Sequence, residues 1–152
     1  MSLKQITDST ETKPMNDKTT VFLDTNLLIY AHTTVEILKQ QQVQQIIIDE
    51  NTVISTQVFK EVANVLYKKF GFSWEDVQKV LENMEQNNEV HSNTFNTVQT
   101  ACKIAQRYDF SFYDSLIVAA ALESSCSILY SEDLHHQQVI EKTLTVINPF
   151  SK

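Results

Sequence analysis

The sequence predicts an α/β fold in which helices cover both faces of a parallel β-sheet. Short apolar segments of strand length recur along the chain, and longer segments with helical periodicity separate them. The short segments are apolar throughout, which is typical of strands buried on both faces. Residues 20–152 contain no linker or repeat and are expected to form one domain. Residues 1–19 are rich in Ser, Thr, Asp and Lys, and we expect them to be a flexible N-terminal tail.

The first half of the domain alternates short strands with longer helices. Residues 21–23, Val-Phe-Leu, form the first predicted strand, and a helix is expected from about Asn26. A helical segment over residues 34–50 leads to the second strand at residues 53–54. Residues 56–70 then form a helix, because apolar side chains recur there three and four residues apart. These side chains are Val58, Val62, Val65 and Leu66.

Turn and cap residues mark the boundaries in the second half. Gly71 ends the preceding helix, and Ser73 caps the next one, with Asp76 three residues later. Two further helices are expected, over residues 93–108 and 111–124. The remaining strands are predicted at residues 89–91, 127–130 and 144–147.

Composition narrows the class of protein. The chain has a net charge of −7 and a single arginine, so nucleic acid repels it at long range. Any nucleic-acid chemistry therefore needs a local cation, such as a bound metal ion. No apolar run approaches the roughly 20 residues of a membrane-spanning helix, and the first residues lack the apolar stretch of a signal peptide. We therefore expect a cytoplasmic protein without membrane association, with Cys102 and Cys126 as buried thiols.

Two acidic residues follow predicted strands. Asp24 ends the first strand, and Asp133 comes just after the strand at residues 127–130. Taken singly, Asp24 could be a helix N-cap and Asp133 an ordinary turn residue. The carboxyl ends of parallel strands are also where open α/β sheets bind their ligands. The two side chains therefore converge if their strands are neighbours.

Two further acids lie on the apolar faces of predicted helices. Glu61 has Val58 three residues before it and Val65 four residues after it, so its carboxylate shares a face with apolar side chains. Asp114 stands three residues after Ser111 in a capping-box pattern, and it begins the inward face of the most hydrophobic helix. The candidate catalytic and metal-ligating set is therefore Asp24, Glu61, Asp114 and Asp133.

A cluster of carboxylates has a direct chemical consequence. Two carboxylates about 4 Å apart repel by roughly 4 kcal/mol at an effective dielectric constant of about 20, so the group needs a cation or stays partly protonated. Oxygen ligands favour hard cations, which predicts Mg²⁺, with Mn²⁺ as a substitute. Such an ion can activate water for attack on a phosphodiester. Thr25, Asn26 and Ser131 are candidates to orient the carboxylates or the water.

The four acids stand in four short motifs. These are Phe22-Leu23-Asp24-Thr25-Asn26, Glu61-Val62-Ala63-Asn64-Val65-Leu66, Phe112-Tyr113-Asp114-Ser115-Leu116 and Leu129-Tyr130-Ser131-Glu132-Asp133-Leu134. In order and spacing they resemble the motifs of PIN-domain ribonucleases, specifically the VapC-like toxins of toxin–antitoxin pairs. The ending Ile147-Asn148-Pro149-Phe150 is also similar, so that the resemblance covers residues 21–150.

The resemblance implies a three-layer α/β/α fold around a central parallel sheet of about five strands. It also implies Mg²⁺-dependent endoribonuclease activity on RNA, a homodimer, and inhibition by a small antitoxin protein. One departure lies in the loop after Asp133, where His136-Gln137 stands in place of a glycine that often follows the fourth motif. The segment before Thr20 is longer than usual and has no match.

Two other interpretations of the acids remain. A haloacid-dehalogenase-type phosphatase also has an acid after its first strand, but it requires a second aspartate where this chain has Asn26. A catalytically weak PIN-like scaffold that only binds protein or RNA would suit the acidic balance of the chain. Such a scaffold, however, has no use for clustered, mutually repelling carboxylates.

Basic and aromatic side chains are candidates for contacts with RNA or a protein partner. Solvated helix faces explain the basic residues equally well. These residues are Lys60, Lys68, Lys69, Lys103 and Arg107. Phe70, Phe72 and Trp74 flank Gly71, and we expect them to pack in the core of the helix hairpin rather than to form a partner surface.

Overall fold

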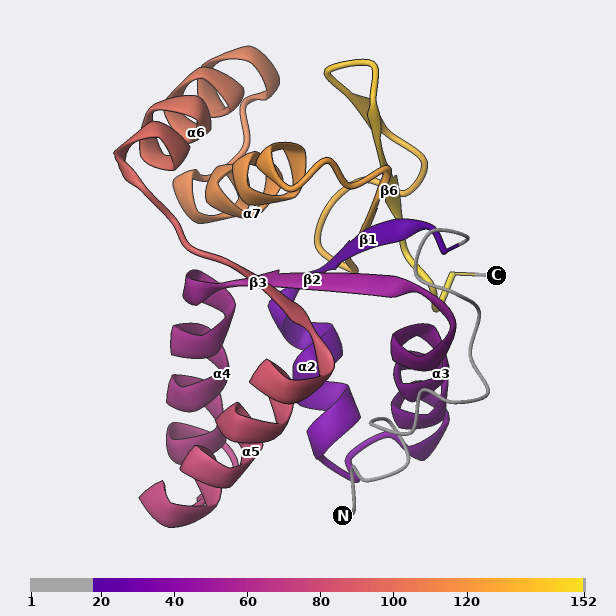
Figure 1. Cartoon of the computed structure of the whole chain (residues 1–152), viewed down its shortest axis with the longest axis vertical. Coiled ribbons are helices and arrows are strands. Elements are labelled where there is room, and N and C mark those ends of the chain that lie inside the picture. Colours follow the sequence, from indigo (N-terminus) through magenta and orange to yellow (C-terminus); the bar gives the residue numbers. More distant parts are fainter. Residues whose placement is uncertain (1–17, 152) are drawn as a thin grey trace.

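One sheet separates two layers of helices in the computed structural model, which describes residues 18–151 (Figure 1). Helices α2 to α5 lie on one face of the sheet, and α6 and α7 lie on the other (Figure 1). This arrangement confirms the predicted three-layer α/β/α fold. The predicted tail, apart from its last two residues, falls in residues 1–17 and lies outside the described residues, as does Lys152.

The sheet has the order β3-β2-β1-β4-β6-β5. Five of its strands are parallel, and β5 pairs with β6 in the antiparallel direction. The five parallel strands match the predicted ones, whereas β5 was not predicted because it has only two residues in a polar stretch. The strands are β1 (Thr20–Leu23), β2 (Asn51–Ser55), β3 (Glu89–His91), β4 (Ile128–Tyr130), β5 (Val139–Ile140) and β6 (Leu144–Ile147).

Six helices occupy the part of the chain that the structure describes, close to the predicted places. They are α2 (Thr25–His32), α3 (Ile37–Asp49), α4 (Thr56–Lys68), α5 (Trp74–Asn87), α6 (Phe95–Tyr108) and α7 (Phe112–Glu123). The predicted boundary between α4 and α5 is confirmed. Gly71 has a φ of +70°, which glycine adopts without a steric penalty, and the Ser73 hydroxyl accepts a hydrogen bond from Asp76 N at 3.1 Å.

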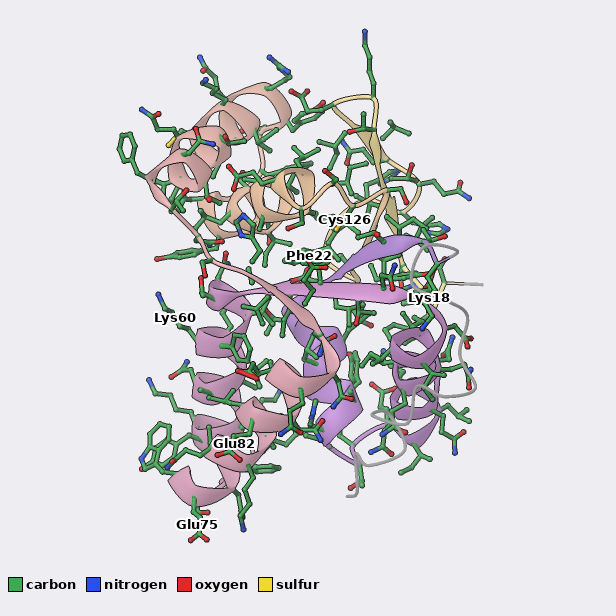
Figure 2. All side chains as sticks on the ribbon, viewed as in Figure 1. Lys18, Phe22, Lys60, Glu75, Glu82 and Cys126 are labelled. Atoms are coloured by element: carbon green, nitrogen blue, oxygen red, sulfur yellow. The ribbon has the colours of Figure 1, made fainter. Side chains whose placement is uncertain are left out.

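The central strand β1 is buried between the two helical layers. Val21, Phe22 and Leu23 have no exposed surface, as expected for a strand covered on both faces. Figure 2 shows Phe22 and Cys126 in the interior, next to the sheet. Cys126 is buried as predicted, but the same prediction for Cys102 was wrong. Cys102 is exposed because the inward face of α6 is taken by other side chains, namely Thr97, Ala101 and Ile104.

The aromatic residues around Gly71 divide into two groups. Phe70 and Phe72 are partly buried and pack against the core, as predicted. The prediction for Trp74 was wrong, since 53% of its surface is exposed. Trp74 is the first residue of α5, whose buried positions are Val77 and Met84. Its indole ring instead stacks on another exposed ring, that of Tyr67.

The sheet order decides where the predicted acids meet. β1 is hydrogen-bonded to β4, with Leu23 opposite Tyr130, and Asp24 N donates to the Tyr130 carbonyl at 3.0 Å. The residues that follow these two strands therefore emerge side by side at one edge of the sheet.

Within residues 18–151, no helix has the length and apolar character needed to cross a membrane.

Candidate active site

A cleft of about 300 Å³ opens where β1 and β4 end. All four acids predicted from the sequence line it, and they come from four different places in the chain. Thr25 and Asn26 line it as well, while Ser131 is buried beneath. The full lining is Asp24, Thr25, Asn26, Gln57, Glu61, Asn64, Val65, Tyr113, Asp114, Ile117 and Asp133.

Asp24 is the most buried of the four acids, with 7% of its surface exposed. It precedes α2, and its carboxylate accepts hydrogen bonds from Thr25 N at 2.7 Å and from the Ser131 hydroxyl at 2.8 Å. Burial raises the pKa of Asp24 to about 6, and the negative charges of Asp133 and Asp114 add to this effect. The two hydrogen bonds lower the pKa but do not offset burial. Asp24 is thus both the helix N-cap and an incompletely stabilised charge.

Ser131 connects the first acid to the fourth. Its hydroxyl oxygen also accepts a hydrogen bond from Asp133 N at 3.1 Å, so one side chain fixes the Asp24 carboxylate and the backbone of Asp133. The Asn26 amide donates to the Asp133 carboxylate at 3.4 Å. Partial burial raises the pKa of Asp133, and neighbouring acids raise it further, Asp114 most strongly. Ser131 and Asn26 therefore hold Asp133 beside other negative charges.

Glu61 reaches the cleft from α4 and is held by two neighbours. The Thr25 hydroxyl donates to one of its carboxylate oxygens, and the Gln57 amide donates to the other at 3.4 Å. The same Gln57 amide donates to the Tyr113 carbonyl at 3.2 Å. Because Tyr113 lies in the first turn of α7, Gln57 links the helix that carries Glu61 to the helix that carries Asp114.

Asp114 lies in the first turn of α7. Its backbone N donates to the Ser111 hydroxyl at 3.1 Å, which confirms Ser111 as the N-cap of this helix. Within the described residues, the Asp114 carboxylate does not return a hydrogen bond to Ser111, so only half of the predicted capping box forms. The carboxylate lines the cleft instead.

Several cleft residues were not predicted from the sequence. Helical spacing could have identified Gln57 and Asn64, which stand four residues before and three residues after Glu61. Tyr113 contributes a backbone carbonyl to the Gln57 contact, and a carbonyl has no signature in a sequence. Val65 and Ile117 add apolar walls, in keeping with their predicted places on inward helix faces.

The donor atoms of the cleft suit a hard divalent cation. The carboxylate, hydroxyl and amide oxygens present there are the ligands that Mg²⁺ and Mn²⁺ prefer. No lysine or arginine lines the cleft among the described residues, and burial together with the neighbouring acids raises the pKa of Asp24 and of Asp133. Across residues 18–151, however, no three His, Cys, Asp or Glu side chains are grouped closely enough to hold one ion together. Full coordination would therefore need water or movement of the carboxylates.

The loop after Asp133 keeps a tight backbone without glycine. Gln137 has a φ of +72°, in the left-handed region that glycine favours. Its backbone N donates to the Val146 carbonyl at 2.7 Å, and the His136 ring accepts from Asn148 N at 3.0 Å. The loop is thus tied to β6 and to the segment that follows it.

Comparisons with known proteins agree with this fold. The chain is similar to the toxin VapC20 of Mycobacterium tuberculosis, described as cleaving the sarcin–ricin loop, with 15% identity and a TM-score of 0.62 over 74% of this chain and 89% of that one. A toxin–antitoxin complex from Klebsiella pneumoniae gives 18% identity and a TM-score of 0.65 over 87% and 99% of the two chains. VapBC2 from Rickettsia felis, bound to a fragment of its promoter DNA, gives 15% and 0.63 over 84% and 98%.

Sequence comparison gives a direct assignment. No curated protein matches the chain by sequence. Residues 21–142, most of the chain, match the family model of the PIN domain. This match contains all four acidic motifs and ends after β5. The chain therefore belongs to the PIN domain family.

Proposed function

We propose that this protein is a metal-dependent endoribonuclease that hydrolyses RNA phosphodiester bonds. Its catalytic and metal-ligating residues would be Asp24, Glu61, Asp114 and Asp133. The observation that carries the proposal is the cleft itself, which these four acids line without a basic side chain of the described residues to balance them. Repulsion between uncompensated carboxylates does not stabilise a fold, so we infer that the cleft binds a ligand that neutralises their charge.

Some residues of the cleft would bind the metal ion, and others would orient the residues that bind it. The four carboxylates would hold Mg²⁺, or Mn²⁺ in its place, directly or through water. When bound, the ion would activate a water molecule and offset the charge that develops on the phosphate. Ser131 fixes Asp24 and Asp133, while Thr25 and Gln57 fix Glu61. Asn26 limits the movement of Asp133. These contacts would keep the carboxylates in place for the ion.

The proposal extends to the biological role. The neighbouring structures include a toxin and toxin–antitoxin complexes, and the toxin is described as cleaving the sarcin–ricin loop. We infer that this chain is the toxin of such a pair, acts on RNA in the cytoplasm, and forms a homodimer. Light scattering of the purified protein tests the dimer, and expression with the product of an adjacent small gene tests the pair.

An exposed apolar surface supports a protein partner. Val35, Ile37 and Leu38, where α2 gives way to α3, are 58%, 49% and 77% exposed. Val35 also lines a groove of about 420 Å³ whose surface is mainly apolar, together with His32, Thr33, Thr34, Phe70 and Phe72. Exposed apolar surface of this kind marks protein interaction sites in soluble proteins. We expect Leu38→Asp to abolish antitoxin binding while ribonuclease activity remains.

Thermal melting with and without Mn²⁺ tests the metal site. Binding to the folded state alone raises the melting temperature, so we expect Mn²⁺ to stabilise the natural protein and not Asp114→Asn. Cleavage of a labelled RNA should then depend on the same ion and fail in the same variant. Equal stabilisation of both proteins by Mn²⁺ would remove Asp114 from the site.

A catalytically weak scaffold is the second candidate. One observation favours it: no three acidic or other ligating side chains of the described residues are grouped for direct coordination. A scaffold would bind RNA or protein with no response to Mn²⁺ in the melting experiment and with no cleavage. Stabilisation by Mn²⁺ together with metal-dependent cleavage would exclude it.

A further inference from the structure

The cleft continues onto an exposed face of α4. This helix contributes Gln57, Glu61, Asn64 and Val65 to the cleft, and their spacing marks one helical face. The next position of that face is Lys68, which is exposed and follows Glu61 by seven residues. At 1.5 Å per residue, Lys68 lies about 10 Å beyond Glu61 along the helix axis. An RNA strand leaving the cleft along α4 would therefore meet a positive charge.

The lysines of α4 form no ion pair with the acids of residues 18–151. Among the described residues, Lys39, Lys79 and Arg107 form ion pairs with glutamates, whereas Lys60 and Lys68 form none. Figure 2 shows Lys60 projecting outward from α4. Although the chain has a net charge of −7, Lys60 and Lys68 place two positive charges, unpaired within the described residues, on the helix that carries Glu61. Such a feature attracts the phosphates that the cleft itself repels.

Two aromatic rings lie beside these lysines. Tyr67 follows Lys60 by seven residues and Asn64 by three, so it shares their side of α4. Its ring stacks on that of Trp74, with the ring centroids 4.0 Å apart and the planes 9° from parallel. The two side chains nevertheless remain 44% and 53% exposed. Exposed aromatic rings close to cations are typical of surfaces on which unpaired bases stack.

We propose that the α4 face, formed by Lys60, Asn64, Tyr67, Lys68 and the adjoining Trp74, binds single-stranded RNA next to the cleft. The lysines contact phosphates, and the aromatic pair stacks on a base. The proposal deepens the ribonuclease function proposed above and rests on it. An unpaired strand is the fitting ligand because a base inside a duplex cannot reach an aromatic ring.

Trp74 makes binding at this face directly observable. It is the only tryptophan of the chain, so the intrinsic tryptophan fluorescence reports on this place alone. We would titrate the protein with a short oligoadenylate in the presence of a chelator, so that no cleavage occurs. We expect the fluorescence to be quenched as the RNA binds. Binding without any change of fluorescence would overturn the proposal.

Variants of α4 with a matched control separate local contacts from general charge effects. Lys68→Ala should weaken binding and reduce the slope of log affinity against log salt by about 0.7, the value for one phosphate of a single strand. Lys142→Ala removes the same charge from the exposed turn between β5 and β6 and should leave both values unchanged. Equal effects of the two variants would overturn the proposal.

The stacking contribution has its own test. Tyr67→Ala should weaken oligoadenylate binding roughly 5- to 100-fold, whereas Tyr67→Phe should retain most of it. The melting temperature of each variant checks that it is folded. If Tyr67→Phe and Tyr67→Ala are both folded and bind RNA as the natural protein does, the α4 face is not an RNA surface. The same conclusion follows if Trp74→Ala impairs the binding of a protein partner and leaves RNA binding unchanged. RNA binding without metal-dependent cleavage would instead contradict the proposed catalytic function alone.

Discussion

Glu132 and Asp133 are adjacent in the loop after β4, but their carboxylates have opposite surroundings. Glu132 accepts hydrogen bonds from Lys39 Nζ at 2.8 Å and from the Tyr30 hydroxyl at 2.6 Å. The Asp133 carboxylate has, among the described residues, only the uncharged Asn26 amide as a donor, at 3.4 Å. Glu132 is thus held by a cation, whereas Asp133 shares the cleft with Asp24 and other acids.

Two other acids outside the cleft also have close partners. Glu141 is paired with Arg107, and Glu123 accepts hydrogen bonds from His91, Asn96 and Thr97. Glu132, Glu141 and Glu123 therefore each have compensating groups around the carboxylate. Among the described residues, the cleft acids have no cation beside them, which costs stability in the absence of a ligand. This difference is what a cation-binding function requires, and each prediction below tests one side of it.

The largest expected effect comes from replacing a cleft acid with its amide. Asp133→Asn should lower ribonuclease activity about a thousandfold, roughly 4 kcal/mol of transition-state stabilisation, because the amide cannot hold a cation in the same way. Glu132→Gln, the matched change at the neighbouring residue, should stay within a few-fold of the natural protein. Single-turnover cleavage of a labelled RNA at saturating Mg²⁺ measures both. Similar losses in the two variants would remove the distinction between the two acids.

The next effect is on the stability of the protein without metal. Asp24 has a pKa of about 6 in the fold against 3.8 ordinarily. Below pH 3.8 the group is neutral in both the folded and the unfolded state, and no cost arises. Above about pH 6 it is charged in both, and burial of the charge costs up to about 3 kcal/mol. The free energy of unfolding should therefore fall between pH 4 and 6.

Asp24→Asn removes this titration while the amide can still cap α2. With a chelator present, the variant should be more stable than the natural protein at pH 7 and closer to it at pH 4, as measured by urea unfolding. Asp109→Asn changes an exposed acid in the left-handed position after α6, where asparagine is well tolerated, and serves as the control. A difference between Asp24→Asn and the natural protein that is the same at both pH values would contradict the expectation.

A smaller effect is expected from the hydroxyl that supports two cleft acids. Ser131 lowers the pKa of Asp24 through its hydrogen bond, so Ser131→Ala should raise that pKa and weaken Mn²⁺ binding about 10- to 100-fold at neutral pH. The difference in Mn²⁺ affinity between the variant and the natural protein should become smaller as the pH rises, because Asp24 then ionises even without the hydrogen bond from Ser131. Calorimetric titration with Mn²⁺ at two pH values measures this, with Ser127→Ala, at an exposed serine just before β4, as the control.

Much of this contrast could be predicted from the sequence, for identifiable reasons. The apolar run before Asp24 marked a buried strand, and parallel pairing placed the ends of β1 and β4 together. Helical spacing put Glu61 and Asp114 on inward faces. The Gln57 link to the Tyr113 carbonyl could not be predicted, since it depends on how α4 and α7 approach each other. Nor could the exposure of Trp74, because residue type alone favours burial of a large aromatic ring.

The smallest expected effect concerns Glu132, the carboxylate that is paired with Lys39. The Lys39 and Glu132 side chains are 22% and 21% exposed, and Lys39 also lies 4.6 Å from the centre of the Tyr30 ring and 4.7 Å from that of Phe150. Lys39→Met leaves Glu132 without its cation and should cost about 1 kcal/mol in the free energy of unfolding, more at low salt than at high salt.

The control for that variant is an exposed pair of the same type. Lys79 and Glu75 are 68% and 80% exposed at a separation of 3.6 Å, so solvent screens them and Lys79→Met should change stability by no more than a few tenths of a kcal/mol. Glu132→Gln in the Lys39→Met background should restore part of the loss, since the uncompensated charge is then gone. If the double variant is no more stable than Lys39→Met, Lys39 stabilises the protein by packing on the Tyr30 and Phe150 rings and not by pairing with Glu132. The charge of Glu132 would then not be compensated by Lys39, and the contrast with Asp133 would fail.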